Sequence, residues 1–128
     1  MTIEREVIAG PGVAIGPYSQ GVRAGDLLYV SGQPGIDPES GEPAGPSFRD
    51  QARQAMRNLE LVLRAGGSRP ELVVNTTVLL ADMADFAVVN EIFAETFPVD
   101  PPARMMMQVP LPLGLLISVG CVAMVASA

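Results

Sequence analysis

Residues 47–67 read SFRDQARQAMRNLELVLRAGG, and this stretch predicts the long helix around which the rest of the chain is organised. Ser47 followed by Asp50 is a capping-box pattern at the start of the stretch. Gly66 and Gly67 are predicted to end the helix. The apolar residues recur in steps of three and four and therefore form one stripe along the helix. The stripe consists of Phe48, Ala52, Ala55, Met56, Leu59, Val62 and Leu63.

On either side of this helix the pattern predicts strands and one further helix. The second helix is predicted to start near Asp82 or Asp85 and to end at Pro98, because the residue before a proline disfavours the helical region. A loop rich in Gly, Pro, Asp and Glu covers 33–46. The order of elements predicts one α+β domain over 1–128, with the helices packed on one face of a mixed sheet. The predicted strands are 5–9, 20–24, 27–33, 73–80, 103–109 and 115–125.

The composition narrows the chemistry that the chain can perform. It has no histidine and no lysine, so all eight basic residues are arginine. Histidine dyads, His-rich metal sites, a Schiff-base lysine and a P-loop lysine are therefore excluded. A net charge of −6 disfavours binding to nucleic acid. We expect mild chemistry on an already reactive substrate, with no metal ion.

The last 24 residues, 105–128, carry no charged side chain. Prolines break this segment, and its longest apolar run is too short to span a bilayer. No signal pattern opens the chain, and a single cysteine, Cys121, fits a reducing compartment, so a cytoplasmic protein without a membrane partner is expected. The 115–125 strand is apolar on both faces, which indicates that a partner subunit covers one of them.

Arg104 is the last charged residue and opens a strand in this uncharged region. Its guanidinium offers a planar fork of donors that matches a carboxylate. In a partly buried place it needs an anion. Two kinds of partner stay open on spacing alone: Asp100 or another acidic side chain in a salt bridge, or the carboxylate of a ligand.

Two short segments hold further candidate residues. Tyr18 in GPYSQ (16–20) could donate a hydrogen bond to a substrate. Gly32, beside Ser31 in SGQP (31–34), would let a ligand approach the backbone closely. Either segment could also be an ordinary turn or strand end. Ser31 is not expected to act as a nucleophile, because no histidine or lysine is present to activate it.

Five segments in order along nearly the whole chain resemble the Rid family, also called YjgF-like or reactive-intermediate imine deaminases. The resemblance implies a chorismate-mutase-like α+β fold and a homotrimer with three ligand clefts between subunits. It also implies hydrolysis of 2-imino acids or their enamines, such as 2-iminobutanoate and 2-iminopropanoate, to 2-oxo acids and ammonia without a cofactor. The segments are IGPYSQ at 15–20, YVSGQ at 29–33, QARQA at 51–55, DFAVVN at 85–90 and PAR at 102–104.

The resemblance also implies roles for particular residues. Arg104 matches the arginine that clamps the substrate carboxylate. Tyr18, Ser31 and Gly32 match residues of the cleft, with the Gly32 carbonyl a candidate for orienting water. Asn90 matches a further family position on the second helix.

Two positions of the predicted substrate site depart from the family pattern. Met106 stands where deaminase members often have cysteine, and Gly120 stands where they have a glutamate that helps to position the attacking water. The leading hypothesis is therefore an imine or enamine deaminase acting on a small carboxylate-bearing substrate. Gly120 leaves open a non-catalytic trimer that binds 2-oxo or imino acids or another protein, or a related hydrolase with a larger substrate. A nuclease is the weakest hypothesis.

Overall fold

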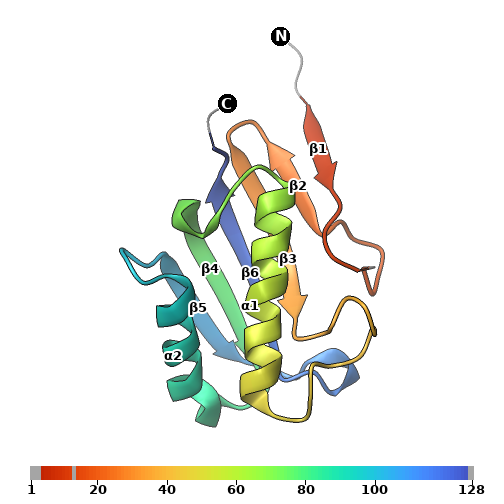
Figure 1. The fold of residues 1–128 in the computed structure, drawn as a ribbon, viewed down its shortest axis with the longest axis vertical. Coiled ribbons are helices and arrows are strands. Elements are labelled where there is room, and N and C mark those ends of the chain that lie inside the picture. The colour runs from red at the N-terminus through yellow and green to blue at the C-terminus, as the bar shows by residue number, and fades with distance from the viewer. Residues whose placement is uncertain (1–3, 13, 127–128) are drawn as a thin grey trace.

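Six strands form one sheet, and both helices lie on the same side of it (Figure 1). The computed structural model describes residues 4–12 and 14–126. The strands follow the spatial order β1-β2-β3-β6-β4-β5, and all neighbours are antiparallel except β4 and β5. The strands are β1 (Arg5–Ile8), β2 (Gly21–Ala24), β3 (Leu27–Pro34), β4 (Val73–Leu80), β5 (Ala103–Gln108) and β6 (Ile117–Met124). The helices are α1 (Phe48–Ala65), α2 (Phe86–Thr96) and the 3-10 turns η1 (Pro70–Leu72), η2 (Met83–Asp85) and η3 (Pro112–Gly114).

The predicted α+β fold, with a mixed sheet and two helices on one face, is confirmed. Each predicted strand agrees with an observed strand to within two residues. The largest difference is at β6, which begins at Ile117 because the N–H groups of Leu115 and Leu116 are bonded to the Pro112 carbonyl and to Gln51 Oε1. The single parallel pair arises because α2 crosses over between β4 and β5, as a parallel connection requires.

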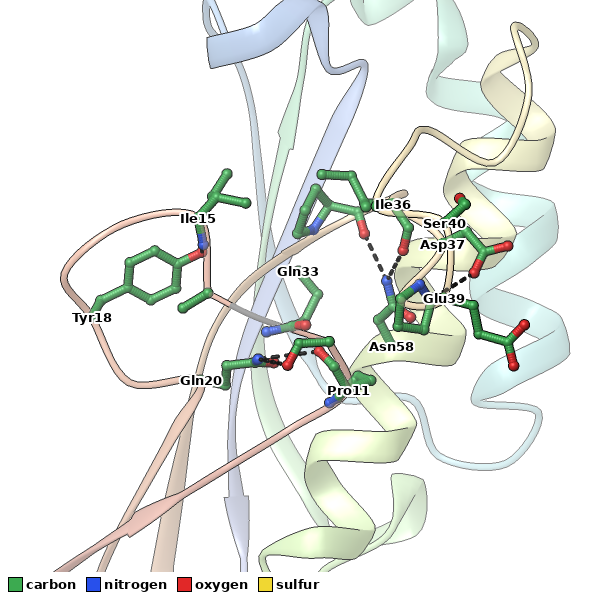
Figure 2. Close-up of a pocket in the computed structure, with 15 residues that line it drawn as sticks. Pro11, Ile15, Tyr18, Gln20, Gln33, Ile36, Asp37, Glu39, Ser40 and Asn58 are labelled. Atoms are coloured by element: carbon green, nitrogen blue, oxygen red, sulfur yellow. Dashed lines mark hydrogen bonds between the residues drawn. The ribbon is translucent and has the colours of Figure 1, made fainter.

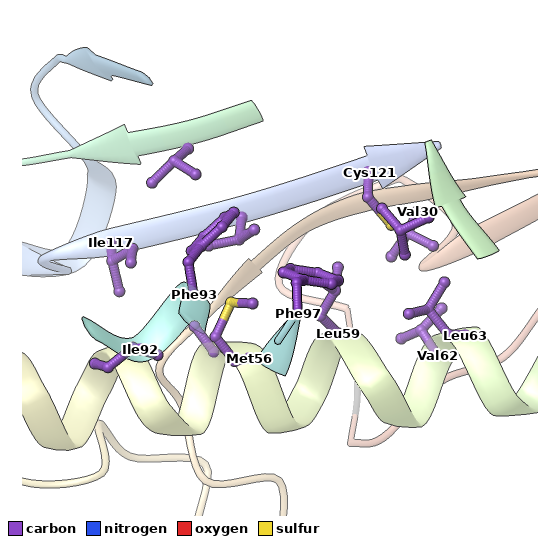
Figure 3. Packing of buried hydrophobic residues seen from close by; sticks show 14 of the residues in the cluster. Val30, Met56, Leu59, Val62, Leu63, Ile92, Phe93, Phe97, Ile117 and Cys121 are labelled. Carbon is purple, nitrogen blue, oxygen red and sulfur yellow. The ribbon is translucent and has the colours of Figure 1, made fainter. Parts of the chain in front are cut away.

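The long helix α1 begins and ends where its caps predict. The Asp50 backbone N–H donates to Ser47 Oγ at 3.1 Å, and Gly67 follows the helix with a φ of +81°. The apolar stripe packs against the sheet, and Figure 3 shows Met56 and Leu59 pointing from α1 toward the strands. Leu59 is 1 % exposed, and burying such a side chain contributes about 2 kcal/mol.

Three buried polar side chains of α1 hold the loop between β3 and α1. Gln51 Nε2 donates to the Gly45 carbonyl at 3.1 Å. Asn58 Nδ2 donates to the carbonyls of Pro34 and Ile36, at 3.0 and 2.8 Å. Gln54 Nε2 donates to Asn58 Oδ1 at 2.9 Å and so orients the Asn58 amide. Two of these residues belong to the QARQA segment, whose glutamines therefore anchor the chain that leads out of β3.

The face of the sheet opposite the helices is uncovered in a single chain. Along β6, Val119 and Cys121 are buried on the helix side, whereas Gly120 and Val122 are half-buried on the other. The register places Tyr29, which is 47 % exposed, beside Val122 on this open face. The predicted alternation along the last strand is confirmed, and only one of its two apolar faces is covered within the chain.

The sequence predicts no segment that spans a membrane, and the helices of the structure bear on this prediction. In the part of the chain that the structure describes, neither long helix combines the length and apolar character needed to cross a bilayer.

Candidate functional site

Arg104 lies on the edge strand β5 with its side chain on the helix side of the sheet. It pairs in register with Thr76, which is fully buried beneath the helices. The guanidinium carbon lies 5.0 Å from the ring centroid of Phe93 and 5.8 Å from that of Phe86, both on α2. A charge held over aromatic faces gains a cation–π attraction that also fixes its orientation.

A cavity of about 480 Å³ opens beside this guanidinium. Pro98 ends α2, and the following loop wraps back to β5 and closes the cavity from one side. Asn90 lines the same cavity from α2, one helical turn before Phe93 and Ala94. Arg104 and Asn90 therefore lie together, as the family resemblance implied. Met106 is half-buried two residues further along β5, on the same face as Arg104.

The salt bridge to Asp100 is absent from residues 4–12 and 14–126. The ion pairs formed there are Arg49–Glu91, Arg53–Glu95, Arg64–Glu60 and Arg69–Glu71. Arg104 is exposed rather than partly buried, which corrects the expectation from sequence. The reason is that β5 is the edge strand, so no further strand lies beside it to cover the Arg104 side chain. Within the described chain its donors face no carboxylate.

Tyr18 and Gly32 line a second cavity, of about 460 Å³, which is bounded by the Tyr18 loop, the end of β3, η3 and the start of β6. Tyr18 lies in the loop before β2, where its hydroxyl accepts a hydrogen bond from the Ile15 N–H at 3.4 Å. Ser31 forms two hydrogen bonds with the same loop. Its hydroxyl donates to the Ser19 carbonyl at 2.6 Å, and its N–H donates to the Gln20 carbonyl at 2.9 Å. The Ser31 side chain thus holds the Tyr18 loop in place.

The Tyr18 loop also borders a third, smaller cavity of about 240 Å³ (Figure 2). Gln20 Nε2 donates to the Pro11 carbonyl at 3.1 Å on one side of it, and Asn58 reaches from α1 to the Ile36 carbonyl on the other. These contacts hold the loop that carries Tyr18 and the loop that follows Gly32.

Gly32 sits in a β-bulge of β3, where Ser31 and Gly32 lie opposite the single residue Gly120 of β6. A Cβ at Gly32 would collide with Ser118 Oγ, so the serine hydroxyl lies directly against this glycine. A Cβ at Gly120 would lie 3.1 Å from the Val30 carbonyl oxygen and 3.4 Å from the Gly32 nitrogen. Gly32, Ser118 and Gly120 are therefore packed together on the open face of the sheet.

The two groups of candidate residues are separated within one chain. Arg104 is on β5 and Gly32 is on β3, with β4 and β6 between them. Neighbouring strands are about 4.8 Å apart, which puts the two backbones roughly 14 Å from each other. The Arg104 side chain also lies on the helix side of the sheet, whereas Gly32 packs against Ser118 on the open face. Within one chain, a small substrate bound at Arg104 therefore does not reach Gly32.

Cys121 does not supply a nucleophile. It is buried on the helix side of β6, and burial raises the pKa of its thiol to about 12. The thiol therefore stays protonated and unreactive near neutral pH. Among residues 4–12 and 14–126, no cluster of three or more His, Cys, Asp or Glu side chains could hold a metal ion.

Sequence reasoning missed two features of these sites. The first is the pair of phenylalanines that face Arg104; their spacing of seven residues on a helix placed them on one face, and could have suggested a shared contact. The second is Ser118, which no local pattern marks, because its proximity to Gly32 depends on the register of β3 with β6.

Comparison with known proteins identifies the family. A family model described as Endoribonuclease L-PSP matches residues 10–125. The human protein named 2-iminobutanoate/2-iminopropanoate deaminase is 46 % identical over 111 residues, which cover 86 % of this chain and 81 % of the relative. Reactive Intermediate Deaminase A, chloroplastic, from Arabidopsis thaliana is 42 % identical over 125 residues, covering 95 % and 67 %.

Solved structures show the same fold. RidA from the Antarctic bacterium Psychrobacter sp. PAMC 21119 is 36 % identical with a TM-score of 0.90, covering 94 % of this chain and 99 % of that one. E. coli TdcF with bound serine is 32 % identical with a TM-score of 0.87, covering 94 % and 99 %. The chain therefore belongs to the Rid (YjgF-like, L-PSP) family.

Proposed function

We propose that this protein hydrolyses 2-imino acids and their enamines to 2-oxo acids and ammonia. The observation that carries the proposal is Arg104, whose guanidinium stacks over Phe93 and meets no carboxylate of the described chain. A fixed planar fork without a partner is suited to bind the carboxylate of a substrate in bidentate fashion. Relatives that are 46 % identical carry the name 2-iminobutanoate/2-iminopropanoate deaminase, which supports the same substrate class.

The reaction needs little from the protein because an imine carbon is already electrophilic. Water adds to the C=N carbon of R–C(=NH)–COO⁻, and the C–N bond then breaks to give R–CO–COO⁻ and NH₃. The Gly32 carbonyl accepts a hydrogen bond from the attacking water, and the Tyr18 hydroxyl donates to the substrate. No histidine, lysine, metal ion or cofactor takes part in these steps.

The proposed active unit is a homotrimer with clefts between subunits. Arg104 and Asn90 lie on the helix side of the sheet, whereas Tyr18, Gly32 and Gly120 lie on the open side. A cleft that unites them takes one group from each of two copies. The uncovered face supports this assembly, since it exposes Tyr29, Met105 (59 %) and Met124 (46 %), which a partner would bury. In this assembly Met106, beside Arg104, borders the substrate.

Gly120 supports a second candidate function, a trimer that binds 2-oxo or imino acids without turning them over. This glycine stands where the family pattern has a glutamate that positions water. Loss of a water-positioning group lowers rates by a factor on the order of 10²–10⁴ without preventing binding. Endoribonuclease activity, which the description of the family model names, is not proposed, because a net charge of −6 opposes contact with phosphates.

The test compares wild-type protein with Arg104→Ala and a control, Arg57→Ala, which also removes an exposed arginine. An amino acid oxidase generates 2-iminobutanoate in place, and formation of 2-oxobutanoate is followed. We expect hydrolysis above the uncatalysed rate for wild type and for Arg57→Ala, and loss of at least about a hundredfold in kcat/KM for Arg104→Ala. If all three proteins give the same rate as the uncatalysed reaction, the proposal that this protein is a deaminase is wrong. Stabilisation by 2-oxobutanoate without turnover would favour the binding trimer.

A further inference from the structure

The cavity beside Gly32 has an almost wholly apolar wall. Among residues 4–12 and 14–126, no charged side chain lines it, and its polar side chains are those of Tyr18 and Ser118. Its volume of about 460 Å³ falls in the usual range of small-molecule sites. The wall is completed by Ile15, Pro34, Leu111, Pro112, Leu113, Leu115 and Ile117.

Leu113 is placed in this wall against its own conformational preference. It lies in η3 with a φ of +59°, in the left-handed region that leucine rarely adopts, and 75 % of it is exposed. Aspartate, asparagine or glycine would suit this turn better. An exposed leucine also gains little from burial within its own chain. The folding of one chain therefore gives no reason for leucine here, whereas contact with an apolar ligand does.

We infer that this cavity receives the side chain of the substrate, and that this side chain is uncharged, apolar and larger than ethyl. The inference rests on the proposed function and refines its substrate class. The cavity shares Tyr18 and Gly32 with the proposed reaction centre, so a group attached to the imine carbon extends into it. A charged side chain would lose its hydration against this wall, and the described residues that form the wall offer it no counter-ion.

The first experiment compares 2-imino acids that differ only in their side chain. The imino acids derived from alanine, 2-aminobutyrate, leucine, methionine and aspartate are generated with oxidases, and kcat/KM is measured for each. We expect the leucine and methionine derivatives to exceed the alanine derivative by at least about tenfold, because each added methylene in an apolar pocket discriminates by that order. The aspartate derivative should be the poorest. A preference for the alanine derivative would overturn the inference while leaving the deaminase function in place.

A second measurement separates failure of the inference from failure of the function. Binding of stable 2-oxo acids is followed by thermal shift, which needs no turnover. If no imino acid is hydrolysed, the enzyme proposal fails. The cavity inference still stands in that case if 4-methyl-2-oxopentanoate stabilises the protein more than 2-oxopropanoate does, and it falls if the order is reversed.

The variant Leu113→Asp tests the wall itself, with Leu61→Asp on the exposed side of α1 as the matched control. Leu61 is 45 % exposed and does not line the cavity. We expect Leu113→Asp to keep its Tm, because aspartate tolerates a positive φ, and to lose the preference for the leucine derivative by about tenfold. Leu61→Asp should retain that preference. A change of oligomeric state for Leu113→Asp alone would overturn the inference, since the leucine would then cover a partner subunit.

Discussion

Replacing Asn58 with alanine removes three hydrogen bonds, two of which tie α1 to the chain leaving β3. Asn58 is 4 % exposed, and its amide bonds the Pro34 carbonyl at 3.0 Å, the Ile36 carbonyl at 2.8 Å and Gln54 Nε2 at 2.9 Å. The β3 end that these bonds hold carries Gly32, so the substitution loosens one side of the proposed site.

The expected loss of stability follows from this count. Each buried hydrogen bond contributes about 1 kcal/mol net, so the variant should lose about 3 kcal/mol. Domains of this size are stable by only about 5–15 kcal/mol. Unfolding entropy is about 2.1 cal/mol/K per residue, which converts the loss to a fall in Tm of roughly 10 °C.

Urea unfolding and thermal melting at one fixed protein concentration measure the effect, with Arg57→Ala as the control on the exposed side of the same helix. The control should change stability by less than about 0.5 kcal/mol. If Asn58→Ala loses less than about 1 kcal/mol, the two bonds to the Pro34 and Ile36 carbonyls do not anchor the loop as described. A fall in kcat/KM without loss of stability would also contradict the reasoning, because the effect on Gly32 is expected to follow from loosening of this anchor.

Two further predictions concern residues of β6, namely Ser118, which packs against Gly32 of β3, and Cys121. Gly32→Ala should destabilise the protein by on the order of 1 kcal/mol, because the new methyl group collides with Ser118 Oγ. Adding Ser118→Ala should recover most of the lost stability, since the nearest remaining atom, the Cβ of residue 118, would be 3.7 Å from the new methyl group. Equal stability of the single and double variants in urea would contradict this prediction. Cys121, with its pKa raised to about 12, should be alkylated at pH 8 about 10³-fold more slowly in the native protein than in urea, where its pKa is ordinary. The same shift makes burial of the neutral thiol stabilising below about pH 9, and this contribution should fall as pH rises from there toward 12, more steeply in wild type than in Cys121→Ala. Native alkylation within tenfold of the rate in urea would show that the thiol is accessible.

The family and the fold could be predicted from sequence because their signals are local. The cap at Ser47, the stop at Gly66 and Gly67, and the apolar stripe between them depend on residues within a few positions of each other. The alternation along β6 is equally local, and it indicated a strand with two apolar faces before any packing was known. The chemistry was limited in the same way, since the absence of histidine and lysine does not depend on how the chain folds.

The arrangement of the candidate site was decided by tertiary structure. Spacing left Arg104 with two partners, and only the position of β5 at the sheet edge, with α2 above it, removed Asp100 and placed Phe93 against the guanidinium. Likewise, the hydroxyl of Ser31 is used to hold a loop, because the register of β3 brings it to the Ser19 carbonyl.

The sequence by itself therefore determined the elements, their order and the kinds of reaction that the side chains allow. Tertiary structure decided that Arg104 and Gly32 lie on opposite faces of one sheet. It also decided that Ser118 packs against Gly32 and that Leu113 lines the same cavity as Gly32. The physical reason is that strand register and crossover join residues far apart in the chain. Such pairings depend on the packing of the whole domain, and no short window of sequence contains it.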